Sequence, residues 1–167
     1  MMTEQALSPA IGTKYPLLFT YRDTLFGNGF LVEVQAINGR ALCVREEDAY
    51  WIYGINPGGM AAHGEHPDAA HSAFRKTFSR ILVDLALGSS NFEAFRDAVR
   101  AFFEETNEGY EGEWRDAIAG VQRGEVSLEG IPTVPANSPR SIAVSVKQVE
   151  QVTPQDNSAN VQYLLAA

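Results

Sequence analysis

The chain has 167 residues, 45% of them hydrophobic, and a formal net charge of −8 at pH 7. This length and apolar content are enough for one domain with a hydrophobic core. Because phosphate groups repel an acidic surface, the charge argues against direct nucleic-acid or anionic-membrane binding, whereas it suits a basic protein partner.

The cysteine count and the start of the chain indicate a cytoplasmic protein. Cys43 is the single cysteine, so no intrachain disulfide can form, and this is consistent with a reducing compartment. The surrounding apolar run predicts that Cys43 is a small buried residue rather than a catalytic thiol. The first residues lack the basic start and apolar stretch of a signal peptide, and no apolar run reaches the roughly 18 residues of a membrane span.

The first half of the chain predicts an antiparallel β-meander of four to five strands. From Tyr15 onward apolar and polar residues alternate, and a second alternating run follows the turn at Gly27–Gly29. Asn38-Gly39 is typical of a tight hairpin and predicts a third strand directly after it. Residues 49–55 are aromatic and β-branched and predict a fourth strand, and residues 60–63 predict a short fifth.

The spacing of apolar residues then changes to that of helices. Residues 67–87 predict the first helix, with a proline in its first turn and Gly88 at its exit. Ser90 and Glu93 have the spacing of a capping box and predict the start of a second helix. A third, shorter helix is expected over residues 111–123. A meander followed by helices predicts an α+β fold, with the helices packed on one face of the sheet.

Composition divides the chain into three parts. Residues 1–14 form an expected flexible leader, residues 15–130 the α+β domain, and residues 131–167 a proline-containing linker and a β-rich tail. Within the tail, residues 141–149 and 160–167 are strand-like and neutral, so we expect them to pair with a sheet. That sheet belongs either to the same chain or to a neighbouring subunit, and the second possibility would make the protein a self-associating structural protein.

All three histidines, His63, His66 and His71, lie close together in the sequence, with Glu65 among them. A catalytic zinc site uses three protein ligands and one open position, so a small metal-dependent hydrolase using this stretch is an alternative function. His66 precedes the predicted helix and His71 lies inside it, so their spacing fixes no common geometry. The preferred interpretation is a turn with polar histidines. No nucleophile elbow or phosphate-binding loop occurs, and we predict no catalytic residue and no cofactor.

Aromatic residues in the predicted fourth strand are candidates for a binding surface. Tyr50, Trp51 and Tyr53 lie there, with Tyr110 and Trp114 further along the chain. Aromatic side chains in a strand serve either as core packing or as a platform for a peptide or a base. Few Lys or Arg residues are nearby, which disfavours RNA. Core packing is the preferred interpretation of these aromatic residues, and Tyr50, Trp51 and Tyr53 are the candidate partner-binding residues if the strand is instead a binding surface.

Between Gly54 and Ala70 the chain has a Pro57-Gly58 turn, Gly64 after a short predicted strand, and Asp68 and Ala70 at the start of a predicted helix. This arrangement resembles the HicB antitoxin family. In that family a strand ends at a Pro-Gly turn, a short strand leads to a Gly-Asp-Thr-like cap, and Glu-Glu-Ala begins a helix. The likeness covers about residues 15–88. The residues at matching or nearly matching positions are Pro57-Gly58, Gly64, Asp68 and Ala70.

This resemblance implies a non-enzymatic protein of a toxin–antitoxin system that masks a small basic RNA-cleaving toxin. The chain departs from the pattern of the family in two places. Residues 38–53 look like an inserted hairpin, and the tail offers no basic DNA-binding helix. The resemblance therefore implies a cytoplasmic, HicB-like protein-binding module without operator binding. We also expect a homo-oligomer.

Overall fold

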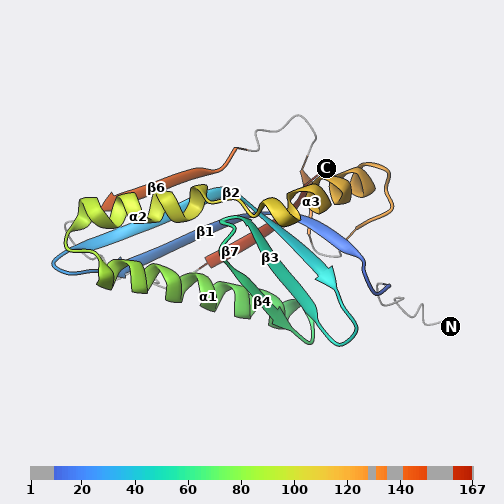
Figure 1. Ribbon diagram of the computed structural model, residues 1–167, viewed down its shortest axis with the longest axis horizontal. Helices are drawn as coiled ribbons and strands as arrows, with labels where there is room; N and C mark the ends of the chain where they lie inside the picture. Colours follow the sequence, from blue (N-terminus) through green and yellow to red (C-terminus); the bar gives the residue numbers. More distant parts are fainter. Residues whose placement is uncertain (1–9, 128–130, 135–140, 150–159, 167) are drawn as a thin grey trace.

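The computed structural model describes residues 10–127, 131–134, 141–149 and 160–166 and has the predicted α+β fold (Figure 1). The elements in chain order are β1 (Lys14–Phe26), β2 (Leu31–Arg45), β3 (Tyr50–Asn56), β4 (Ala61–Gly64), α1 (Pro67–Gly88), α2 (Phe92–Glu104), α3 (Glu108–Gln122), β5 (Thr133–Val134), β6 (Ala143–Gln148) and β7 (Asn160–Ala166). Residues 1–9 of the expected leader and parts of the proline-containing linker lie outside the described residues. No helix in the described ranges is long and apolar enough to cross a membrane.

The strands of the described residues form one sheet in the order β4-β3-β2-β1-β7-β5, with β6 paired to β2. Strands β1 to β4 are the predicted antiparallel meander, including its short last strand. Strand β2 is long enough to hold two partners along one edge. Its residues 32–37 pair with β6, and its residues 40–45 pair with β3.

The hairpin predicted at Asn38-Gly39 is wrong, because β2 runs straight through these residues. Phe19 pairs with Gly39 but Tyr21 pairs with Ala36, so β2 carries a bulge at this point. Asn38 adopts a left-handed φ of 59°, which asparagine tolerates. A side chain on Gly39 would come within 2.4 Å of the Phe19 ring, so glycine is required there by packing. The supposed inserted hairpin is thus the second half of β2 and the start of β3.

The two strands of the tail, β6 and β7, belong to this chain's own sheet. Strand β7 pairs with residues 17–22 of β1, and β6 pairs with β2. Both predicted strands are therefore confirmed, and in this structure they pair within the chain rather than with a neighbour. The short strand β5, which lies in the linker, pairs with β7 in the parallel direction.

Helices α1 and α2 cover one face of the sheet with an aromatic core, and both lie along its length (Figure 1). The Phe19 ring centroid lies 5.6 Å from those of Phe74 and Phe78, and Tyr21 stacks on Phe78 at 4.3 Å. Burial of such large apolar side chains is the main favourable term in folding. The stripe that α1 buries consists of Ala70, Phe74, Phe78, Leu82 and Ala86.

Helix α3 covers the opposite face, so the expectation of helices on one face holds for α1 and α2 only. Successive residues of a strand point to opposite faces. Leu17 therefore packs in the core under α1 and α2, whereas Leu18 packs in a second core with Trp114 of α3. The chain crosses between the faces at the edge of β3. There the Gly58 amide donates to the Glu105 carbonyl at 2.8 Å, and a side chain on Gly58 would collide with the α2–α3 backbone.

Candidate partner-binding site

Four aromatic rings form a continuous row on the face of the sheet that α3 partly covers. The ring centroids of His63 and Trp51 lie 4.4 Å apart, those of Trp51 and Tyr53 lie 5.7 Å apart, and those of Tyr53 and Tyr110 lie 4.5 Å apart. The planes of each pair are within 28° of parallel. Trp51, Tyr53 and Tyr110 are half-buried and His63 is exposed, so the row is open to solvent along one side. We call these four residues the aromatic row.

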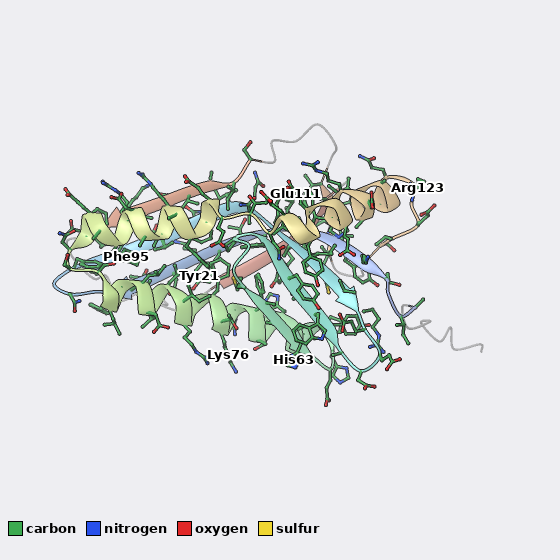
Figure 2. The ribbon with its side chains drawn as sticks, in the orientation of Figure 1. Tyr21, His63, Lys76, Phe95, Glu111 and Arg123 are labelled. Carbon is green, nitrogen blue, oxygen red and sulfur yellow. The ribbon has the colours of Figure 1, made fainter. Side chains whose placement is uncertain are left out.

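Strand geometry places the row. Trp51 and Tyr53 are two residues apart in β3 and therefore point to the same face. Trp51 lies directly opposite His63 of β4, which brings the indole and the imidazole together. Figure 2 shows His63 on β4, at the margin of the sheet. Tyr110 comes from the first turns of α3 and completes the row at its other end.

Tyr50, the third candidate partner-binding residue, lies on the other face of the sheet. Its side chain is buried in the core under α1 and α2, and the guanidinium of Arg45 lies 5.0 Å from its ring centroid. The structure therefore brings together Trp51 and Tyr53 but separates Tyr50 from them. Trp114, which the sequence grouped with these residues, is buried beneath α3, where Arg40 lies over its ring.

A cavity of about 480 Å³ adjoins the aromatic row at Trp51. Its other walls come from the turn between β2 and β3 and from the segment before β1. The Gly12 amide donates to the Arg45 carbonyl at 2.6 Å and fixes that segment beside the turn. Its apolar wall comes from Ile11 and Trp51, and its charged lining residues are Arg45, Glu46, Glu47 and Asp48.

The row and the cavity are joined by a hydrogen bond. The Tyr53 hydroxyl donates to Oε1 of Glu46 at 3.0 Å. Burial raises the pKa of Tyr53, and the neighbouring Glu46 and Tyr110 raise it further, so this hydroxyl stays protonated as a donor. The Arg45 guanidinium donates to the carbonyl oxygens of Glu46, Glu47 and Ala49. Its charge is thus directed to the turn backbone rather than to the acidic side chains.

The three histidines lie in three different surroundings. His63 ends the aromatic row, His66 is the N-terminal cap of α1, and His71 lies within α1 with its ring edge-on to Tyr163 at 4.6 Å. Burial lowers the pKa of His71, and the nearby Arg75 lowers it further. Within the part of the chain that the structure describes, no group of three His, Cys, Asp or Glu residues is placed to hold a metal ion.

Sequence reasoning missed two features of this site. The acidic turn at residues 46–48 borders the cavity, whereas its sequence alone indicates only a connection between two strands. His63 was considered only as a metal ligand. The observed register of β3 with β4 places His63 opposite Trp51.

Comparisons of the chain with protein-family models, with curated proteins and with solved structures find no match. The function is therefore inferred from the geometry and charge of the aromatic row and the cavity, together with the sequence motifs between Gly54 and Ala70.

Proposed function

We propose that the protein is a non-enzymatic protein-binding module of HicB-like fold that binds and masks a small basic protein, such as an RNA-cleaving toxin. The observation that carries the proposal is the half-exposed aromatic row. Tyr and Trp side chains are enriched at the energetic centres of protein interfaces, because they bury large area and lose little conformational entropy. A row of stacked rings held by two strands and a helix is already ordered before a partner binds.

The charge of the chain favours a basic partner. The net charge is −8, and the exposed residues Glu46, Glu47 and Asp48 lie beside the row. Complementary charge raises the rate of association and selects against acidic proteins. The likeness to HicB rests on the sequence motifs between Gly54 and Ala70 and adds the expectation that the partner is a toxin.

No comparable observation favours the other functions considered from the sequence. The three histidines of the supposed metal-dependent hydrolase do not come together among the described residues. The tail strands of the supposed self-associating protein pair with β1 and β2 of the same chain.

The proposal is tested by affinity purification of the tagged protein from its native cells, followed by mass spectrometry. We expect a small basic protein at a near-equal amount to the bait. The double variant Trp51→Ala/Tyr53→Ala should lose this protein. A Phe26→Ala variant is the matched control, because Phe26 is an exposed aromatic residue at the end of β1, next to the β1–β2 turn.

Retention of the same protein by the double variant would contradict a role for the aromatic row. Recovery of nothing except the bait would contradict the protein-binding function itself. Circular dichroism of each variant must match that of the wild type, so that loss of binding is not caused by loss of fold.

A further inference from the structure

We propose that the cavity beside Trp51 binds one cationic side chain, a lysine or an arginine, of the protein partner. The inference rests on the proposed function, because it names the group by which the partner would be recognised. It concerns the cavity rather than the aromatic row, and the two can be tested separately.

The cavity has the size and walls that a long side chain needs. Its volume of about 480 Å³ lies within the range of ligand sites and exceeds the volume of a single side chain. Ile11 is 66% exposed at its margin, and the half-buried Trp51 supplies a second apolar wall. Lysine and arginine have aliphatic stems that pack on such surfaces while their charged ends remain among polar groups.

The charge of the cavity selects a cation. In the described ranges Glu46, Glu47 and Asp48 form no ion pair with a Lys or Arg side chain of the chain itself. Arg45 directs its guanidinium to carbonyl oxygens of the same turn and to the Tyr50 ring. The three carboxylates outnumber the one guanidinium of Arg45 at the cavity, and this excess of negative charge favours a positive group from outside.

The position of the cavity favours a side chain of a larger partner over a free small cation. Trp51 belongs both to the cavity wall and to the aromatic row. A polypeptide that lies across Tyr53 and Trp51 therefore reaches the cavity without leaving the surface. The hydrogen bond from Tyr53 to Glu46 fixes one carboxylate beside this path.

The experiment is an NMR titration of the ¹⁵N-labelled full chain with two peptides that differ only in charge. One is acetyl-Gly-Arg-Gly-Arg-Gly-amide, and the other carries citrulline, which is close to arginine in shape but neutral, at both arginine positions. We expect saturable shifts of the Trp51 indole N–H and of the amides of residues 46–49 with the arginine peptide only. These shifts should weaken as salt is added.

Two charge-matched variants locate the site. The variant Glu46→Gln/Glu47→Gln/Asp48→Asn should lower the affinity for the arginine peptide by about tenfold or more. The variant Asp84→Asn/Asp97→Asn/Glu104→Gln removes the same charge from exposed positions on α1 and α2, and should bind like the wild type. Equal binding of the citrulline peptide, equal binding by the cavity variant, or shifts that map elsewhere would each overturn the inference.

A separate titration with spermidine tests whether the cavity binds a small free cation instead of a side chain of a protein. Shifts at the cavity with spermidine and none with the arginine peptide would assign the site to a small polyamine and overturn the proposal. The affinity purification separates this inference from the proposed function. A basic protein retained by the cavity variant and lost by the Trp51→Ala/Tyr53→Ala variant refutes the cavity and leaves the proposed function standing. Binding of the arginine peptide in the cavity, together with recovery of no partner protein, would support the cavity site and contradict the proposed function.

Discussion

The guanidinium of Arg40 donates two hydrogen bonds to Oδ1 of Asn56, one of them from Nε at 3.1 Å. Nδ2 of Asn56 in turn donates to the carbonyls of Phe103 at 3.1 Å and Glu105 at 3.2 Å, where α2 ends. Arg40 also reaches Oε1 of Glu111 in α3 at 3.1 Å. The half-buried Arg40 and the buried Asn56 therefore join β2 and β3 to helices α2 and α3 at the point where the chain changes faces of the sheet.

We predict that Asn56→Ala lowers the free energy of unfolding by about 2–3 kcal/mol, since it leaves buried carbonyl groups without their donor and removes one of the two side chains that accept from the Arg40 guanidinium. Chemical denaturation measures this change. Asp97→Asn is the control, because Asp97 is exposed and pairs only with its neighbour Arg96 among the described residues, and it should change stability by less than about 0.5 kcal/mol. A stability of Asn56→Ala equal to that of the control would show that the Arg40–Asn56 pair does not hold the crossing.

The aromatic core under α1 and α2 gives a second prediction. Phe78 is fully buried, stacks on Tyr21 and lies 5.4 Å from Phe103. Phe78→Ala should cost about 3–5 kcal/mol through lost burial and the cavity that remains, and Phe78→Leu should cost less while keeping the fold. Lys76→Ala is the control on the same helix, since Figure 2 shows the Lys76 side chain pointing away from the sheet. A control that lost as much stability as Phe78→Ala would contradict the assigned face of α1.

His71 gives a prediction on pH. Burial and, after it, Arg75 lower the pKa of His71 below its ordinary value of 6.5, while Asp68 acts against this shift. The fold therefore prefers the neutral imidazole. This contribution is fully present above about pH 6.5 and is lost as the pH falls through the lowered folded-state pKa. The thermal unfolding midpoint of the wild type should decrease when the pH is lowered from 8 to 5.5. The decrease should be smaller in His71→Gln.

Elements whose boundaries depend on neighbouring residues were predicted well. Helix α1 begins at Pro67 and ends at Gly88, because a proline in the first turn and a glycine at the exit act locally. Helix α2 is capped by Asn91, whose Oδ1 accepts from the Ala94 amide, rather than by the predicted Ser90. Both residues can cap a helix, so a one-residue error is inherent in this signal.

Features that depend on distant contacts were not predicted. Asn38-Gly39 has the local chemistry of a turn, but pairing of β2 with β1 and β6 on its two sides keeps the strand continuous and turns the dipeptide into a bulge. The aromatic row needs both the register of β3 with β4 and the passage of α3 to the second face of the sheet. That passage depends on contacts of Asn56 and Gly58 with residues nearly fifty positions away, which periodicity cannot reveal.

Cys43 gives the last prediction. Its side chain is buried in the core under α1 and α2, and burial raises the pKa of the thiol to about 12. Because only the thiolate is nucleophilic, the native protein should react with a chromogenic disulfide reagent at pH 8 at least about 100-fold more slowly than the protein in denaturant. In denaturant the reaction should release one chromogenic thiolate from the reagent for each chain, because the chain has one cysteine. A Cys43→Ser/Ser127→Cys variant, which moves the thiol to an exposed position, should react rapidly without denaturant. Equal native rates for the two proteins would show that Cys43 is accessible and that the sheet opens readily near the C-terminal end of β2.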